Sequence, residues 1–164
     1  GVGKTTLVKE VAKKAKEENL FGDVVMAVVS QNPDLRKIQD EIQDILGFKF
    51  KQKSLSGRAD ALREQLKCRK KILVILDDVW ERLDLDDIGI PFGDSHKGCK
   101  ILVTSRSEEV CNDMGTQKKF TIQVLPKEEA WNLFTEMAGI SEGDTNFQST
   151  RMAVANECGG LPFA

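Results

Sequence analysis

The chain begins with six residues whose types and order suit phosphate binding: Gly1, Val2, Gly3, Lys4, Thr5 and Thr6. The sequence pattern of a phosphate-binding loop is G-x-x-x-x-G-K-[ST], and these residues match its second half. In that loop, backbone N–H groups surround phosphate oxygens, the lysine neutralises the charge of the β- and γ-phosphates, and the hydroxyl ligates Mg²⁺. We therefore expect Lys4 to bind nucleotide phosphates and Thr5 to hold the metal ion.

Two adjacent carboxylates, Asp77 and Asp78, follow a run of five branched aliphatic residues at 72–76. Such a run is typical of a strand that is covered on both faces of a sheet. Charge at the end of a buried strand is costly unless a cation or a reacting water lies opposite. We expect Asp77 to hold Mg²⁺, directly or through water, and Asp78 to orient or deprotonate the attacking water. The alternative is that one of them only caps the following turn.

An arginine, Arg106, follows a second apolar segment, residues 100–104. The carboxyl ends of parallel strands lie along one edge of a sheet, so Arg106 would project from the same edge as the two carboxylates. Two interpretations stay open: Arg106 contacts the γ-phosphate, or it is a surface arginine paired with Glu108 or Glu109. Loop, hydroxyl, acidic strand end and arginine together form the minimum set for binding a nucleoside triphosphate with Mg²⁺.

Alternating helical and strand patterns predict the elements that position these residues. Apolar residues at helical spacing behind the loop predict a helix through residue 15, whose positive N-terminal end would face the phosphates. Other predicted segments are strands at 24–29, 72–76, 100–104 and 120–124, a loop at 48–57, and helices at 35–46, 59–66, 126–137 and 152–158. This order predicts an α/β fold with a parallel sheet.

The chain starts inside the loop pattern, so we expect the first glycine of that pattern, and the strand that feeds the loop, to lie upstream. Residues 139–146 are rich in Gly, Ser, Asp, Glu and Asn and predict a linker. We therefore predict a truncated nucleotide-binding domain at 1–138 and the beginning of a second module at 139–164. Because a missing strand would leave unpaired backbone edges, we expect poor solubility and negligible ATPase activity for this piece alone.

Composition and isolated side chains argue against several other classes. A net charge of −2 and a pI near 5.6 give no general electrostatic attraction for nucleic acid, and no direct binding to it is predicted. The four cysteines lack metal-ligand spacing, and Cys99 and Cys158 are expected to fill the core or close a helix. Trp80 and Trp131 are expected in the core, and His96, the only histidine, in solvent.

Six motifs occur in one order: GVGKTT at 1–6, VVSQ at 28–31, KKILVILDDVW at 70–80, GCKILVTSR at 98–106, LPKEEAWNLF at 125–134 and CGGLPFA at 158–164. In this order they resemble the NB-ARC domain of plant nucleotide-binding leucine-rich-repeat disease-resistance proteins, from its P-loop to its GLPL motif. Trp80 resembles the coiled-coil (non-TIR) subclass, because the Toll/interleukin-receptor subclass usually has Asp there. Ser105 and Phe163 depart from the usual Thr and Leu without altering charge.

The resemblance implies a STAND/AAA-like P-loop NTPase: a three-layer αβα parallel sheet, here lacking its first strand, followed by the start of a helical ARC module. Carried over residue by residue, it assigns phosphate and Mg²⁺ binding to Gly3, Lys4 and Thr5, the metal to Asp77, hydrolysis to Asp78, the γ-phosphate to Arg106 and proximity to the base to Pro162. The implied ligands are ATP or ADP with Mg²⁺.

The resemblance also implies a molecular switch. Bound ADP would hold an intracellular plant immune receptor off, exchange for ATP would permit homo-oligomerisation and defence signalling, and slow hydrolysis would reset the off state. The implied partners are the protein's own flanking coiled-coil, ARC and leucine-rich-repeat domains and, through them, a pathogen effector or a guarded host protein. The expected location is the cytoplasm, with the plasma membrane as an alternative through the upstream region.

Two other classes of protein stay under consideration. A turnover P-loop ATPase or a small-molecule kinase would use the same residues, but a kinase needs an acceptor pocket and a basic lid, for which the sequence gives no convincing signal. An inert scaffold would have lost hydrolysis, and the presence of Lys4, Asp77 and Asp78 argues against that.

Overall fold

The computed structural model of the protein describes residues 2–139 and 148–162. The described residues form two compact units: residues 7–119, and the residues before 7 together with those from 120 onward. The larger unit contains the sheet, and the smaller one contains two helices near the C-terminus. These units reflect spatial contact, and the predicted module boundary after residue 138 stays a prediction.

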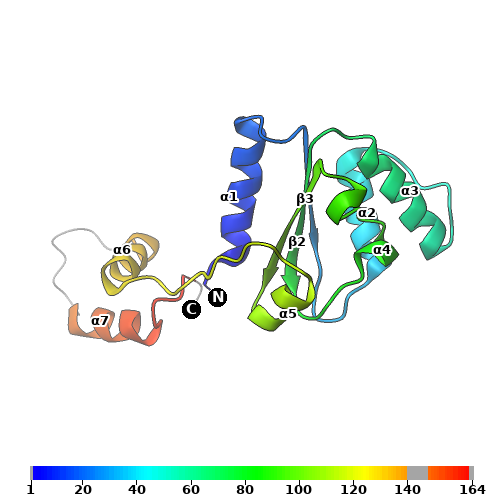
Figure 1. The fold of residues 1–164 in the computed structure, drawn as a ribbon. Coiled ribbons are helices and arrows are strands. Elements are labelled where there is room, and N and C mark those ends of the chain that lie inside the picture. The colour runs from blue at the N-terminus through cyan, green and yellow to red at the C-terminus, as the bar shows by residue number, and fades with distance from the viewer. Residues whose placement is uncertain (1, 140–147, 163–164) are drawn as a thin grey trace. The chain divides into compact units, whose positions relative to one another are not determined.

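The larger unit is built on a three-stranded parallel sheet in the order β1-β2-β3 (Figure 1). Its strands are β1 (Asp23–Val28), β2 (Ile72–Val79) and β3 (Cys99–Ser105). Val74 in the central strand lies opposite Val25 and Ile101, which fixes the register. Every residue of β2 is buried except Asp78, which is half-buried. The predicted buried strand at 72–76 is thus confirmed, and it continues through both carboxylates.

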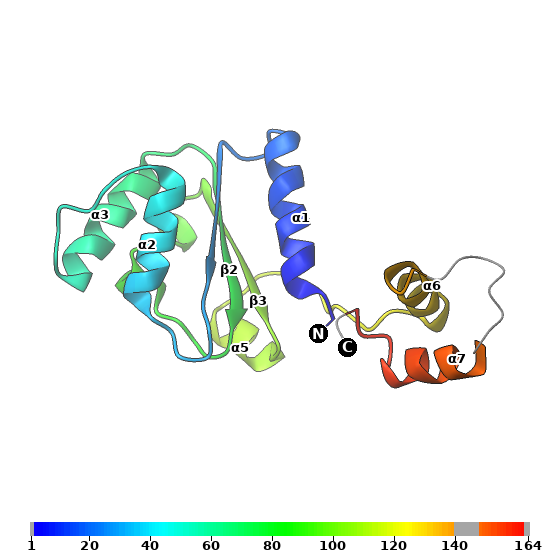
Figure 2. The same ribbon diagram turned by 180° about the vertical axis from the view of Figure 1, so that it is seen from behind.

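Helices cover both faces of this sheet (Figures 1 and 2). Helix α1 (Lys4–Glu17) lies on one face, where Val8 and Ala15 pack with Leu73 and Ile75 of β2. Helices α2 (Leu35–Leu46) and α3 (Leu55–Lys67) lie on the other face. Alternate β2 residues therefore enter opposite layers, as the period of two along a strand requires. The larger core cluster includes Val25, Ala27, Ile38, Ile42, Leu62, Leu66, Val74, Leu76 and Ile88.

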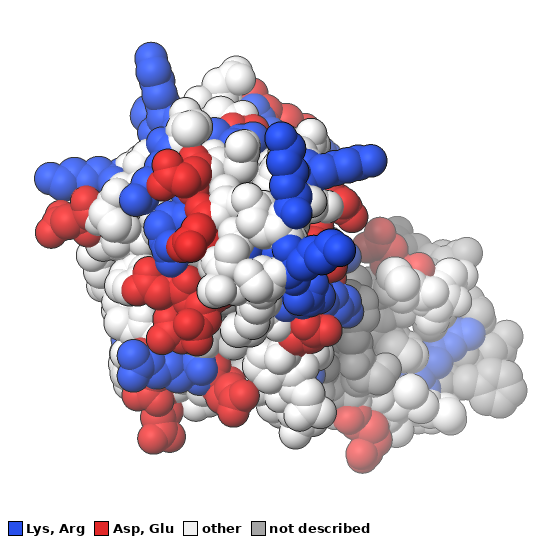
Figure 3. All heavy atoms as spheres, turned by 90° about the vertical axis from the view of Figure 1, so that its right-hand side faces the viewer, with Lys and Arg blue, Asp and Glu red and all other residues white. Residues whose placement is uncertain are grey.

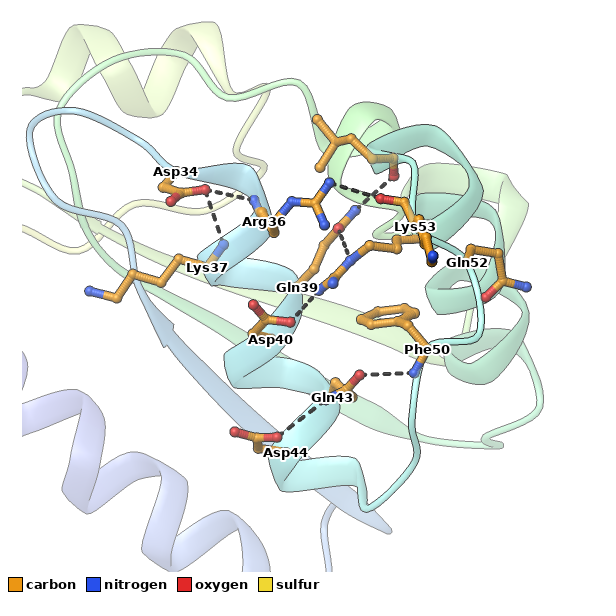
Figure 4. A network of polar contacts seen from close by, with 12 residues as sticks. Asp34, Arg36, Lys37, Gln39, Asp40, Gln43, Asp44, Phe50, Gln52 and Lys53 are labelled. Carbon is orange, nitrogen blue, oxygen red and sulfur yellow. Dashed lines mark hydrogen bonds and ion pairs between the residues drawn. The ribbon is translucent and has the colours of Figure 1, made fainter.

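Helix α2 has clear start and stop signals in the sequence. The Asp34 side chain accepts hydrogen bonds from the backbone N–H groups of Arg36 and Lys37, at 3.0 and 3.1 Å (Figure 4). Gly47 ends the helix in the left-handed conformation, at φ 71°, and its N–H donates to the carbonyl of Gln43. The loop predicted to reach residue 57 is shorter, because the Ser54 side chain caps α3.

A buried polar network joins α2, α3 and α4 (Leu85–Ile88). Gln39 is fully buried; its amide donates to the carbonyl oxygens of Ile88, at 3.0 Å, and Leu55, at 3.3 Å. Arg58 donates from Nε to the Gln39 side-chain oxygen at 3.0 Å and also pairs with Asp40. Figure 4 shows the side chains of Gln39 and Asp40, which α2 contributes to this network. The network supplies hydrogen-bond partners for polar groups that burial would otherwise leave unsatisfied.

Acidic and basic side chains alternate over the face of the molecule shown in Figure 3. On α2 and α3, ion pairs join Lys37 to Glu41 at 3.9 Å and Arg63 to Asp60 at 2.8 Å. Interspersed charges of both signs give this face no large field of one sign.

Short elements complete the larger unit, and the sequence patterns did not predict them. These are α4, a 3₁₀ turn at Gly93–Ser95 and α5 (Glu108–Asp113). Asp84 caps α4 and Ser107 caps α5, so the local signals are present although neither helix shows a full apolar period. None of the helices in the described ranges is long and apolar enough to cross a membrane.

The smaller unit contains α6 (Lys127–Met137) and α7 (Gln148–Glu157). Their residue ranges agree approximately with those of the helices predicted at 126–137 and 152–158. The strand predicted at 120–124 is wrong: the segment pairs with none of the described strands, and Phe120 is 84% exposed. No strand in the described ranges lies beside this segment to form backbone hydrogen bonds with it. Trp131 is half-buried and stacks on Phe134 with ring centroids 5.8 Å apart, so it is not the core residue that was expected.

We predict that Gln39→Leu destabilises the α2–α3 layer by about 2 kcal/mol, because it removes the acceptor of Arg58 and the donor to the carbonyl oxygens of Ile88 and Leu55. The measurement is amide hydrogen exchange of α2 and α3 in the complete protein, which should become faster. Gln117 is exposed, so Gln117→Leu is the matched control and should leave exchange unchanged. Equal exchange in the two variants would contradict a stabilising role for the network.

Burial raises the pKa of the Cys99 thiol from its ordinary 9.0 to about 11, and the smaller effect of Lys100 acts in the opposite direction. The unfolded chain therefore loses this proton at lower pH than the folded chain, and stability is predicted to fall between pH 9 and 11. Cys99→Ala should flatten the pH dependence of the unfolding midpoint in that range. Alkylation at pH 8 should reach the exposed Cys68 long before Cys99; equally fast labelling would refute the burial.

Candidate functional site

The carboxylate of Asp77 is buried at the end of the central strand, with 2% of the residue exposed. Its Oδ1 accepts a hydrogen bond from the hydroxyl of Thr104 on β3, at 2.5 Å. Its backbone carbonyl accepts from the N–H of Val29, at 2.8 Å. Asp77 is thus tied to both neighbouring strands, and its side chain has a fixed position. A buried carboxylate needs such a donor, because burial removes its hydration.

Thr104 is a residue whose role the sequence analysis missed. It is 7% exposed, and its hydroxyl also accepts the backbone N–H of Asp78, at 2.9 Å. One side chain therefore supports both carboxylate residues, through the side chain of one and the main chain of the other. The available signal was a hydroxyl directly after three apolar residues, 101–103, in the strand beside the one with two aspartates near its end.

The two aspartates form a β-bulge at the end of β2. Leu76 lies opposite Val103 and Val79 lies opposite Ser105, so both aspartates face the single residue between those two on β3. Asp78 has φ 57°, a left-handed conformation that non-glycine residues seldom adopt. The bulge turns Asp78 away from the core, so Asp78 is half-buried beside the buried Asp77.

Asp78 contacts two side chains that the sequence analysis treated separately. The indole Nε1 of Trp80 donates to Asp78 Oδ2 at 3.0 Å, and Arg106 Nε lies 3.5 Å from Asp78 Oδ1. The Arg106 guanidinium carbon also lies 4.6 Å from the centroid of the Trp80 ring. Trp80 is 37% exposed and was wrongly expected in the core, because its polar N–H is needed at the sheet edge.

The partner of Arg106 is therefore neither of the two glutamates considered from the sequence. Glu108 instead pairs with Lys119 at 3.0 Å. Arg106 was predicted to lie at the same sheet edge as the two aspartates, and its contact with Asp78 confirms that position. His96 is half-buried rather than solvated; its Nε2 lies 2.8 Å from the carbonyl oxygen of Arg69.

The loop residues lie in the smaller unit, apart from Gly1, which is outside the described residues. Val2 and Gly3 precede α1, and Lys4, Thr5 and Thr6 form its first turn. Gly3 has φ 85°, which favours glycine. A Cβ added at Gly3 would lie 3.8 Å from Cγ of Pro162, so this unit brings the loop and the predicted base-binding proline together.

The donors available for a metal are oxygen atoms. Asp77 and Thr5 offer a carboxylate and a hydroxyl, the ligand types that Mg²⁺ prefers alongside phosphate oxygens and water. Within residues 2–139 and 148–162, no cluster of three or more His, Cys, Asp or Glu residues is arranged to hold a metal. By the chemistry of its oxygen donors, the buried Asp77 carboxylate suits Mg²⁺.

Comparison with known proteins decides the family. The NB-ARC domain family matches residues 1–143 of the chain. A disease resistance protein of Arabidopsis thaliana is 39% identical over 168 residues, which cover 100% of this chain and 17% of that protein. The chain belongs to the NB-ARC family. The resemblance stated from the motifs is thereby confirmed, whereas assignment to the coiled-coil subclass stays a prediction.

Further relatives of this NB-ARC chain in the same plant differ in length. A probable disease resistance protein is 38% identical over 170 residues, covering 100% of this chain and 18% of that protein. A putative disease resistance protein is 37% identical over 171 residues, covering 100% of this chain and 45% of that protein. The chain thus spans less than half the length of each of these three relatives.

A solved structure confirms the fold class. The ORC2 protein of Aeropyrum pernix, solved as ADPNP–ADP complexes, matches with a TM-score of 0.59 and 18% identity over 99% of this chain and 50% of that one. At this identity the likeness concerns the fold alone. The parallel sheet between helical layers is the αβα arrangement of P-loop NTPases, as predicted.

We predict that Thr104→Val lowers the stability of the complete protein by about 1–3 kcal/mol, because it removes one hydrogen-bond donor of the buried Asp77 carboxylate and the acceptor of the Asp78 N–H. Valine matches threonine in shape, so the loss reports the hydroxyl. Thr104→Ser retains the hydroxyl and should keep most of the stability. Thermal unfolding compares the three proteins; a valine variant as stable as the wild type would show that the hydroxyl is dispensable.

Proposed function

We propose that this chain is the nucleotide-binding part of a plant immune receptor that switches between an ADP-bound off state and an ATP-bound active state, with slow hydrolysis resetting the off state. The observation that carries the proposal is the carboxylate pair at the end of the buried β2, with Arg106 reaching it from β3. Membership of the NB-ARC family and the disease-resistance relatives support the biological setting.

The direction of α1 supports phosphate binding at its first turn. After α1 the chain turns at once: the N–H of Gly22 donates to the carbonyl of Lys71, the residue before β2, at 3.0 Å. The end of α1 therefore lies at the amino edge of the sheet. The part of α1 that lies in the larger unit, residues 7–17, is about 16 Å long, which is most of the length of the strands. Its N-terminal part within the larger unit thus points toward the carboxyl edge, where Asp77 lies.

We assign the phosphates to the backbone N–H groups of residues 1–6 and to the side chain of Lys4. Helix N-termini favour anions, because their first N–H groups lack partners within the helix and their dipole is positive there. Thr5 and Asp77 would hold Mg²⁺, which when bound neutralises phosphate charge. Asp78 would orient or deprotonate the attacking water, Arg106 would meet the γ-phosphate, and Pro162 would lie near the base.

The length of the relatives supports the presence of further domains in the receptor. The three relatives extend well beyond the matched segment, which leaves room for flanking coiled-coil, ARC and leucine-rich-repeat domains. We propose that these domains sense a pathogen effector or a guarded host protein and permit homo-oligomerisation with ATP bound. The proposed location is the cytoplasm or the inner side of the plasma membrane.

The test is nucleotide retention and turnover by the complete receptor. Purified wild-type protein should retain ADP and hydrolyse ATP slowly. Lys4→Ala should weaken ADP binding roughly tenfold to a hundredfold, because a charge-assisted contact to phosphate is lost.

Lys13 is the control, because it is an exposed lysine on the same helix. Lys13→Ala should bind ADP as the wild type does. Unchanged ADP occupancy in Lys4→Ala would refute the phosphate assignment. Many turnovers per second in the wild type would refute the switch and favour a turnover ATPase.

A further inference from the structure

Trp80, Asp78 and Arg106 form a closed triangle in which each residue contacts both others. The Trp80 indole donates to one carboxylate oxygen of Asp78 at 3.0 Å, and Arg106 Nε lies 3.5 Å from the other. The guanidinium lies over the indole ring, 4.6 Å from its centroid. One oxygen of Asp78 thus accepts a hydrogen bond and the other forms an ion pair, while the Arg106 cation contacts both a carboxylate and an aromatic face.

These contacts hold Arg106 without burying it. The side chain of Arg106 is 66% exposed and that of Asp78 is 35% exposed. Exposed ion pairs and exposed cation–π contacts are individually weak, so another anion can displace them. The backbone of Asp78 has a left-handed conformation. In this conformation its carboxylate contacts both Trp80 and Arg106. Unusual backbone geometry at such a place favours a functional explanation.

We propose that Trp80 and Asp78 hold the Arg106 guanidinium when no γ-phosphate is present, and that they thereby set the preference of the site between nucleoside diphosphate and triphosphate. The inference rests on the proposed function, in which Arg106 meets the γ-phosphate. A diphosphate leaves Arg106 on Asp78. A triphosphate has to compete with the Asp78 carboxylate for the same cation, so the triangle lowers its advantage over the diphosphate.

Trp80 acts in this scheme as a positioning residue, because it works through its two neighbours. Its ring supplies a flat surface for the guanidinium, and its N–H fixes the orientation of the carboxylate. Phenylalanine would keep the surface and lose the hydrogen bond, whereas leucine would lose both. The two contributions can therefore be separated by substitution.

The experiment measures the dissociation constants of ADP and of a non-hydrolysable ATP analogue, each with Mg²⁺, by competition with labelled ADP in the complete receptor. Trp80→Leu should improve analogue binding relative to ADP by about two- to fivefold, the equivalent of one exposed cation–π contact. Trp80→Phe should give a smaller change in the same direction, and ADP affinity should stay constant in both.

A double-variant cycle isolates the coupling to Arg106. In an Arg106→Gln background, Trp80→Leu should no longer alter the ratio of the two affinities, because no cation is left to hold. Phe50→Leu is the matched control: it removes a contact of the same kind, between Arg58 and the Phe50 ring at 4.2 Å, away from the strand ends. That variant should leave the ratio unchanged.

The outcomes separate this inference from the proposed function. If ADP binding persists but Trp80→Leu and Trp80→Phe leave the ratio unaltered or lower it, the holding role is overturned and nucleotide binding stands. The holding role is also overturned if Phe50→Leu shifts the ratio equally, or if Trp80→Leu acts without Arg106. Should Trp80→Leu fail to fold, Trp80→Phe decides alone. Failure of the wild type to bind either nucleotide would overturn the proposed function itself.

Discussion

The hydrogen bond from Thr104 to the buried carboxylate of Asp77 is the interaction on which the candidate site depends. It places a charged group at the end of a strand that is otherwise packed into apolar layers on both faces. The same hydroxyl accepts the N–H of Asp78 in place of a regular ladder bond, and the strand bulges there. Thr104 thus stabilises Asp77 in a buried position and Asp78 in a half-buried one, so the two adjacent carboxylates have different environments.

Two interactions of different strength occur at this sheet edge: the buried hydrogen bond to Asp77 and the exposed ion pair of Asp78 with Arg106. A buried hydrogen bond to a charged group contributes about 1.5–3 kcal/mol, whereas an exposed ion pair contributes about 0–1 kcal/mol. The first kind fixes Asp77 in the sheet, as its proposed role as a metal ligand requires. The second kind joins Asp78 to Arg106, whose side chain is two-thirds exposed. A rigid carboxylate beside an exchangeable cation suits the proposed discrimination between two nucleotides.

Local patterns in the sequence predicted the elements that lie within one stretch of chain. The aliphatic run at 72–76 and the helix ended by Gly47 were recognisable, because burial on two faces and a left-handed cap leave local signals. The hydrogen bond that Thr104 donates to Asp77, the true partner of Arg106 and the exposed position of Trp80 depend on neighbouring strands and could not be read from spacing. The apolar segment at 120–124 failed as a strand for the same reason.

A structure of the complete receptor with ADP and Mg²⁺ bound would test the central claim most directly. The account predicts phosphate oxygens within hydrogen-bond distance of the backbone N–H groups at Gly3, Lys4 and Thr5, with the metal between them and the Asp77 carboxylate. Nucleotide density that lies away from the first turn of α1, or a metal that faces another group of acids, would contradict it.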